Sequence, residues 1–390
     1  MHSATLLLLS AVSAHGFRGM ANLRSRALEV QDQDSPVLIG DLATLADDRL
    51  SSTGNTIKDI LAGRALSEEL FDHYSSVPDR DSPECKADTC CIWKHIADEM
   101  NAKMKGTAGR CNNLARQAVR MGFHDAATWS TGTGTAGGAD GSLVLAHECY
   151  DRPINKGMES GCDQMQEWFD KYKSYGISMA DLIQMAATVG AVTCPLGPRV
   201  RSFVGRQDNT NAAPENLLPQ PTDSADSLIE LFGNKTISPA DLVALVGAHT
   251  TSQQEFVDPS RAGDPQDSTP GIWDTAFYGQ TLNSAAPRRV FKFQSDINLS
   301  KDKRTRGTWA GFIGLTGQIP WNLAYAKAYV RLSLLGVYNI NNLTECSKAL
   351  PLQLSAFTSP DAKALDKFAE GGLPNAVELA IQGDVIPLTG

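Results

Sequence analysis

The sequence contains no run of clustered lysine or arginine. Its 390 residues carry 35 Lys and Arg against 44 Asp and Glu, so the net charge is -9 and the pI is about 5.3. Proteins that bind nucleic acids draw much of their affinity from clustered cations that contact phosphates. We therefore expect no nucleic-acid partner.

Long hydrophobic runs are also missing. No stretch approaches the ~20 apolar residues that a helix needs to cross a bilayer, so we expect no membrane anchor and a soluble monomer. The short apolar cluster from Leu6 to Leu9 precedes the small residues Ala11, Ser13 and Ala14. This pattern is typical of a secretory signal. It predicts a signal peptide over residues 1–14 and a secreted, extracellular protein.

Alternating strand patterns are scarce, and the chain has no internal repeat. Helix signals are stronger, because Ser178 and Ser238 each precede an apolar stretch and are followed three residues later by an aspartate. Pro239 adds a favoured first-turn residue to the second of these starts. Further helices are expected over residues 90–105, 108–127, 162–175, 223–232 and 320–335. The predicted class is mainly α, with few short strands.

Composition divides the rest of the chain into three segments. Residues 15–80 contain several Asp and Ser residues, one amphipathic stretch at about 56–70 and no cysteine. We interpret them as a mobile pro-segment or an N-terminal extension. Residues 81–358 are dense in helical patterns and form the expected domain. Residues 359–390 are small and polar, and we expect a C-terminal tail that wraps on the surface or stays loose.

Cysteine, in contrast, is plentiful. The eight cysteines are Cys85, Cys90, Cys91, Cys111, Cys149, Cys162, Cys194 and Cys346. An even number in a secreted chain predicts four disulfides, with reduced buried thiols as the alternative. A zinc site is disfavoured because Cys90 and Cys91 are adjacent. Asn234, Asn298 and Asn342 begin Asn-X-Ser/Thr sequons, which fit the same compartment.

Two histidines stand out from their apolar surroundings. On a helix, Arg120 and His124 of VRMGFHDA (119–126) lie one turn apart on one face, whereas Asp125 points about 100 degrees away. A lone histidine in such a place is more often a core residue. His249, however, ends a second apolar helix, where a charged ring would be costly. A neutral ring there suits a metal on one nitrogen and a carboxylate on the other.

An oxygen-rich segment follows each histidine. Asp125 precedes GGADGS (137–142), and Thr250 precedes DSTPGIWD (267–274). Alternating side-chain oxygens and carbonyls, with two carboxylates in each set, suit Ca²⁺ and its about 6–8 oxygen ligands better than Mg²⁺. Either segment alone could be a polar turn without an ion. The repeated pairing with a histidine favours calcium.

Several motifs resemble, in this order, the secreted class II fungal haem peroxidases, the group that contains manganese, lignin and versatile peroxidases. These are RMGFHDA, GGADGS, VGAHT and DSTPGIWD, supported by CPLGPRVRSFVGRQD (194–208), LLPQPTDSADSLIELF (217–232) and FQSD (293–296). The resemblance covers roughly residues 85–350, and the ordered set is specific although each motif alone is weak. It implies the haem-peroxidase fold, with about ten or more helices in two lobes that sandwich one haem b.

The resemblance also implies roles for individual residues. His124 would be the base that takes a proton from hydrogen peroxide, and Arg120 would stabilise the charge that builds as the O–O bond breaks. Phe123 would cover the haem face. Asn155 would accept a hydrogen bond from His124, with Glu148 behind it.

On the other haem face, the resemblance implies His249 as the axial ligand and Asp296 as its carboxylate partner. It implies two Ca²⁺ sites, one held by Asp125, Gly138, Asp140 and Ser142 and the other by Thr250, Asp267, Thr269, Ile272 and Asp274. The implied disulfides join Cys111 to Cys194, Cys149 to Cys162, Cys85 to Cys90 or Cys91, and Cys346 to the remaining one.

Three features depart from the family pattern. A manganese site needs acids where this chain has Asn113, Gln117 and Glu255, and only the last is acidic, so Mn²⁺ oxidation is not expected. Ala244 occupies the position of the surface tryptophan of lignin-type enzymes, and Gln266 replaces an aromatic beside the haem. The possible substitutes for that tryptophan are Trp129, Trp168, Trp273, Trp309 and Trp321.

We therefore predict a secreted haem peroxidase that reduces hydrogen peroxide and oxidises phenolic or aromatic donors by one-electron steps at the haem edge. One alternative is a lignin-type peroxidase with a relocated surface Trp or Tyr radical site. Another is a secreted haem-binding protein of low activity. A phosphohydrolase built on His124 and Asp125 lacks further metal ligands and leaves Arg120 unexplained.

Overall fold

The computed structural model describes residues 37–388, so the signal peptide predicted over 1–14 lies outside the described residues. In this part of the chain there are sixteen α-helices: α2 (Ser52–Leu61), α3 (Pro83–Ala87), α4 (Thr89–Lys103), α5 (Asn113–Ala126), α6 (Ser142–Leu145), α7 (Glu148–Asp151), α8 (Glu159–Tyr172), α9 (Met179–Thr193), α10 (Ala225–Gly233), α11 (Pro239–Val246), α12 (Ala276–Leu282), α13 (Gln294–Lys301), α14 (Arg306–Gly311), α15 (Gln318–Leu332), α16 (Ala362–Ala369) and α17 (Val377–Ile381). The prediction of a mainly α fold is confirmed.

Strands are few and short, as expected. Strand β1 (Phe203–Val204) pairs antiparallel with β4 (Thr344–Glu345), and β2 (Gln253–Gln254) pairs with β3 (Asp264–Pro265). Each strand has two residues, so these pairs fasten loops rather than build a sheet.

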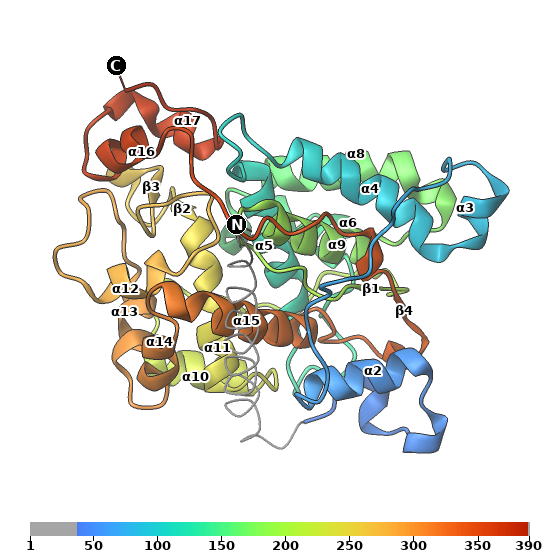
Figure 1. Cartoon of the computed structure of the whole chain (residues 1–390). Helices are drawn as coiled ribbons and strands as arrows, with labels where there is room; N and C mark the ends of the chain where they lie inside the picture. Colours follow the sequence, from blue (N-terminus) through green and yellow to red (C-terminus); the bar gives the residue numbers. More distant parts are fainter. Residues whose placement is uncertain (1–36, 389–390) are drawn as a thin grey trace, which may run out of the picture.

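The helices form two groups that α15 connects (Figure 1). In the first group α5 and α9 pack on each other and on α4 and α8, and in the second α10 to α14 pack together. On α15, Tyr329 donates a hydrogen bond to Gln184 of α9 at 2.9 Å, and Trp321 donates to the carbonyl of Ala244 in α11 at 2.9 Å. This arrangement matches the two-lobed fold implied by the resemblance.

Helix α9 is the centre of the first group. It begins where Ser178 Oγ accepts a hydrogen bond from the backbone NH of Asp181 at 3.0 Å, and each of its residues is buried. Gly122 of α5 lies so close to it that an added Cβ would stand 2.5 Å from Cβ of Ala187 and 2.2 Å from Tyr329 Oη. The close contact fixes α5, and with it His124, against the core.

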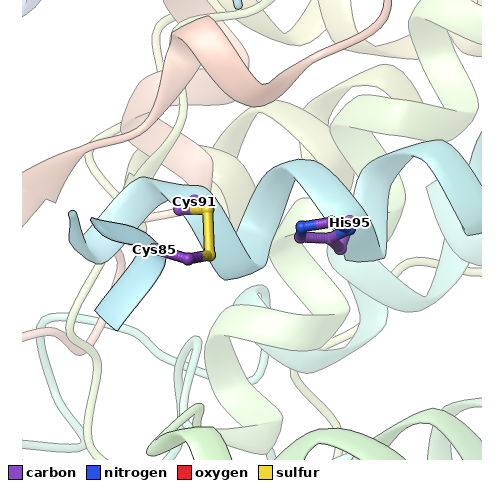
Figure 2. Close-up of side chains that lie close together, drawn as sticks. All are labelled: Cys85, Cys91 and His95. Carbon is purple, nitrogen blue, oxygen red and sulfur yellow. A yellow bond between two sulfur atoms is a disulfide. The ribbon is translucent and has the colours of Figure 1, made fainter. Parts of the chain in front are cut away.

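Four disulfides are present, and no cysteine in residues 37–388 is free. They join Cys85 to Cys91, Cys90 to Cys346, Cys111 to Cys194 and Cys149 to Cys162. The expected pairings are confirmed, and the alternative of reduced thiols is wrong. Figure 2 shows the Cys85–Cys91 bond at the start of α4, beside His95.

The part of the N-terminal segment that the structure describes, residues 37–80, packs on the main body, which fits the N-terminal extension of our two alternatives. Leu42, Ile57 and Ile60 are buried in the main hydrophobic core. Helix α2 lies earlier than the expected 56–70, because Ser51 caps it by accepting a hydrogen bond from the NH of Gly54 at 2.9 Å. These residues therefore form an integrated extension, and the proposed segment boundaries remain predictions.

The C-terminal tail is wrapped rather than loose. Leu365 and Phe368 of α16 form a second hydrophobic cluster with Ile272. Arg110 and Asp361 form a buried ion pair, with Nη2 of the arginine 3.1 Å from the carboxylate. Because a buried arginine needs such a partner, this contact anchors the tail to the loop that precedes α5.

Within residues 37–388 no single helix is long and apolar enough to cross a membrane. One bent pair, Glu159–Tyr175 with Met179–Thr193, meets the length and composition criteria together.

Candidate active site and cation sites

Helix α5 carries the first histidine. It begins at Asn112, whose side-chain oxygen accepts a hydrogen bond from the NH of Ala115 at 3.2 Å. As the spacing predicted, Arg120 and His124 share one face, and Arg120 Nε lies 3.3 Å from His124 Nε2. The His124 side chain is buried.

Asn155 determines which nitrogen of His124 carries the proton. The amide NH₂ of Asn155 donates to the carbonyl of Glu148 at 2.9 Å, so its oxygen faces His124 Nδ1 at 2.8 Å. An amide oxygen can only accept, which places the His124 proton on Nδ1 and the lone pair on Nε2. The ring therefore presents an unprotonated Nε2, which accepts a hydrogen bond from Nε of Arg120 at 3.3 Å.

Burial keeps His124 neutral. Desolvation, and to a lesser degree the charge of Arg120, lower the pKa of His124 to about 3. Arg120 is held by the loop that carries Asn155: its Nη1 donates to Lys156 O and its Nη2 to Ile154 O, each at 2.9 Å. An unprotonated imidazole next to a fixed guanidinium can accept a proton while charge develops beside it.

Phe123 and Glu148 differ in part from their expected contacts. The Phe123 ring stacks on Phe232 of α10, with 6.0 Å between ring centroids. Glu148 supports Asn155 through its backbone carbonyl, not its carboxylate, which pairs instead with Arg152 at 2.8 Å and accepts from the NH of Ala213 at 2.7 Å. The sequence could not separate these contacts, because backbone and side chain belong to the same residue.

Helix α11 leads to the second histidine. Its chain continues into a 3-10 turn, η5 (Gly247–Thr251), and its last carbonyls bind side chains: Val243 O accepts from Tyr278 at 2.8 Å and Ala244 O from Trp321 at 2.9 Å. Gly247 is required, since a Cβ there would lie 2.3 Å from Tyr278 Oη. The tight turn brings His249 out of the core.

His249 is anchored through one nitrogen. Its Nδ1 lies 3.1 Å from Oδ2 of Asp296, a carboxylate that is almost fully buried. The rings of Phe277 and Phe293 approach it edge-on, at 5.7 Å and 5.4 Å between centroids. Its Nε2 makes no hydrogen bond within residues 37–388, and the side chain is 34% exposed. An imidazole fixed in this way fits an axial haem ligand.

The residues predicted to hold the distal cation lie in and just after the end of α5, where Asp125 and Asp140 are close enough to repel each other. The Asp125 carboxylate accepts from the NH groups of Gly141 and Leu143 at 3.2 Å and 3.3 Å, and Asp140 accepts from the NH of Ser142 at 3.0 Å. Burial, with repulsion from Asp140, raises the pKa of Asp125 well above its usual value. Ser142 Oγ is buried and has no hydrogen-bond partner within residues 37–388. Gly138 lies in the same loop with a positive φ of 110°.

The proximal set follows His249, and its members Thr250, Asp267 and Ile272 are buried. Thr250 Oγ1 donates to Asp267 and also lies 3.4 Å from the carbonyl of Ile272. Thr269 Oγ1 lies 3.0 Å from the second oxygen of Asp267. Burial raises the pKa of Asp274 to about 6. Burial and repulsion from Asp274 together raise the pKa of Asp267 well above its usual value. Converging oxygens and buried acids in each set fit a hard divalent cation such as Ca²⁺.

The structure adds an acid that we did not predict as a site residue. Asp208 accepts hydrogen bonds from the NH groups of Met179 and Ala180 at the start of α9, at 3.0 Å and 2.9 Å. Burial raises the pKa of Asp208, with a further contribution from Asp140. The sequence GRQD at the end of the 194–208 segment could have indicated this acid, because it places Asp208 two residues after the buried Arg206.

The side chains at two of the three positions compared with a manganese site, Asn113 and Gln117, contact other groups of the protein. Gln117 donates to Gly157 O at 2.8 Å and exchanges hydrogen bonds with Ser160. Asn113 has the guanidinium of Arg116 3.5 Å from its oxygen. The Gln117 amide is bound to a backbone carbonyl, and Asn113 has the charged Arg116 beside it. Glu255 therefore lacks the acidic partners that a divalent cation requires.

No tryptophan offers a surface radical site of the lignin type. All six tryptophans are buried, and all six lie within residues 37–388. Ala244 is buried as well, and Gln266 is buried with no hydrogen-bond partner for its NH₂ in the described chain. The alternative of a relocated surface tryptophan is therefore not supported.

Comparisons with known proteins agree with this geometry. The peroxidase family model matches residues 96–314. Manganese peroxidase 3 of Phlebia radiata is 32% identical over 284 residues, which cover 67% of this chain and 76% of that protein. A peroxidase of Arthromyces ramosus is 29% identical over 296 residues (70% and 78%), and versatile peroxidase VPS1 of Pleurotus eryngii is 29% identical over 286 residues (68% and 75%).

The family match and the mainly α fold define a haem-dependent oxidoreductase. The chain belongs to the peroxidase family, and its resemblance to fungal class II enzymes is confirmed. It acts on hydrogen peroxide and uses haem as its cofactor.

Proposed function

We propose that this protein is a secreted, monomeric peroxidase that holds one haem b and two Ca²⁺ and oxidises phenols and similar small aromatic donors one electron at a time at the haem edge. The observation that carries the proposal is the His124 ring, whose Nδ1 donates to Asn155 and whose unprotonated Nε2 accepts a hydrogen bond from Nε of Arg120. That arrangement suits proton transfer to and from peroxide.

His249 would hold the haem through Nε2, and Asp296 would strengthen it as a donor through Nδ1. When bound, haem supplies the redox centre at which peroxide is reduced. Nε2 of His124 accepts the proton of the peroxide oxygen and returns it to the oxygen that leaves as water. The guanidinium of Arg120 stabilises the negative charge that builds on the leaving oxygen.

Two Ca²⁺ would hold the ends of the helices that carry these residues. Asp125 directly follows His124, and Thr250 directly follows His249. A cation bound to Asp125, Gly138, Asp140 and Ser142 would offset the repulsion between the buried Asp125 and the half-buried Asp140. A second cation, bound to Thr250, Asp267, Thr269, Ile272 and Asp274, would do the same on the other side.

The class of electron donor can be inferred from the side chains at the surface. Gln117 and Asn113 are unsuited to Mn²⁺, and no tryptophan is exposed in residues 37–388. Electron transfer through a surface tryptophan is therefore not available. Small aromatic donors that reach the haem edge themselves remain, and phenols belong to this class.

Side-by-side steady-state assays test the proposal. The haem-loaded enzyme receives peroxide with a phenol, with a non-phenolic methoxybenzene or with Mn²⁺. We expect turnover of the phenol only, and we expect His124→Leu to lose it. A Soret band that ignores peroxide would support instead a haem-binding protein of low activity. Turnover of the methoxybenzene would favour the lignin-type alternative with a tyrosine as its radical site.

A further inference from the structure

We propose that, in the secreted protein, Asn234 and Asn342 carry N-linked oligosaccharides whereas Asn298 carries none. The inference rests on the secretion included in the proposed function. All three residues begin Asn-X-Ser/Thr sequons, so the sequence alone treats them as equal. Their surroundings in the fold separate them.

Asn234 offers a free side chain at an open position. It follows the last residue of α10 and is exposed, and an added Cβ on the preceding Gly233 would meet nothing within 4 Å. The backbone carbonyl of Asn234 accepts from the NH of Thr131 at 2.8 Å. Its side-chain amide makes no hydrogen bond within residues 37–388. The backbone is therefore held without the amide, which can carry a sugar.

Asn342 is in a similar position at the end of the turn η8 (Ile340–Asn342). It is exposed, and its side chain also has no hydrogen bond in the described part of the chain. The chain then extends through Leu343, with φ -70° and ψ 155°, so that Thr344 is exposed as well. The neighbouring Asn341, in contrast, is engaged: its Oδ1 accepts from the NH of Ser51 at 2.7 Å.

Asn298 is enclosed by its own contacts. It lies inside α13, where its Nδ2 donates to the carbonyl of Asp223 at 2.8 Å and its Oδ1 accepts from Gln294 at 2.8 Å. Ser300, the third residue of the sequon, is buried. N-glycosylation replaces one of the two Nδ2 hydrogens, and the other is already committed to the Asp223 carbonyl. A sugar on this half-buried amide would therefore have to leave along the one remaining N–H direction, beside α13 and the buried Ser300, and this crowding disfavours modification of Asn298.

The modification requires a co-reactant, an oligosaccharide linked to a polyisoprenyl pyrophosphate. The bond between sugar C1 and the pyrophosphate oxygen breaks, and a bond between C1 and asparagine Nδ2 forms. The amide loses one proton, and the polyisoprenyl pyrophosphate leaves. No electron is gained or lost. The product is a bulky, solvated group that only a surface position can accommodate.

Peptide mass spectrometry tests the inference. The full chain is produced in a fungal secretory host, purified from the medium and treated with a peptide N-glycosidase in H₂¹⁸O, which converts each glycosylated asparagine to ¹⁸O-labelled aspartate. We expect label at Asn234 and Asn342 and none at Asn298. Label at Asn298, or its absence from either of the other two, would overturn the inference.

Variants provide a second readout. Asn234→Gln and Asn342→Gln should each remove the mass of one oligosaccharide from the secreted protein, whereas the matched control Asn298→Gln should remove none. These masses do not depend on peroxidase activity. An inactive protein with the expected occupancy would overturn the proposed function and support the inference. Retention of the chain inside the cell would overturn both secretion and the inference.

Discussion

His124 lies in the last turn of the capped helix α5 and His249 directly after the capped helix α11, yet their Nδ1 atoms have different partners. For His124 the partner is the neutral amide oxygen of Asn155 at 2.8 Å, and for His249 it is the buried carboxylate of Asp296 at 3.1 Å. An amide oxygen orients the ring without adding charge, so His124 remains a neutral base. A carboxylate adds electron density, so His249 becomes a stronger metal ligand. The partner of the ring therefore determines which half of the reaction each histidine serves.

Removal of the base should have the largest effect. His124→Leu should still bind haem through His249 but should react with peroxide about 10²–10⁴-fold more slowly or worse, as the loss of a general base gives. Stopped-flow absorption at the Soret band measures this rate. The exposed His73, mutated to Leu, is the control and should react normally. An undiminished rate in His124→Leu would remove this residue from the mechanism.

Exchange of the proximal partner for an amide should have the next largest effect. Asp296→Asn would give His249 the kind of partner that His124 has, and second partners of metal-binding histidines contribute about 10–100-fold to affinity or activity. We expect weaker haem binding and a higher reduction potential, because the imidazole donates less charge. Spectroelectrochemical titration measures the potential. Asp302→Asn, just beyond the end of α13, is the control. Equal potentials in wild type and Asp296→Asn would contradict the comparison.

Removal of calcium should destabilise the distal and the proximal cation sites together. Without cations, Asp125 and Asp140 repel each other, as do Asp267 and Asp274. Each ion should stabilise the fold by about 3 kcal/mol when its free concentration is a hundred times its Kd. A chelator should therefore lower the melting temperature and inactivate slowly, and added Ca²⁺ should restore both. A protein indifferent to the chelator would have neither ion site.

The sequence predicted those structural features whose interacting residues lie close together in the chain. Ser178 and Ser238 both cap the helices expected of them, because a cap contact spans only three residues. The packed N-terminal extension could not be foreseen, since it depends on Ser51 binding Asn341, 290 residues away. The same holds for the tail, which Arg110 anchors through Asp361, 251 residues later. Contacts over such distances leave no pattern in a single sequence.

The buried charge of Lys235, near the end of α5, should make the free energy of unfolding depend on pH. Lys235 is fully buried, and its Nζ donates to the carbonyl of Trp129 at 3.1 Å, just beyond the end of α5. Burial lowers the pKa of Lys235 to about 8, against about 10.4 in an unfolded chain. Between these values the unfolded chain binds more protons, so the contribution of Lys235 to the free energy of unfolding rises with pH.

Lys235→Met removes this titration and retains most of the side-chain volume. The free energy of unfolding of the wild type relative to the variant should therefore increase by up to about 3 kcal/mol from pH 7 to pH 10.5, and little of that change should occur below pH 8. Denaturant titrations at several pH values measure the difference. The exposed Lys303, mutated to Met, should show no such slope. A difference that stays level across this range would mean that Lys235 keeps its charge in the folded protein, with the Trp129 carbonyl and its surroundings compensating for burial.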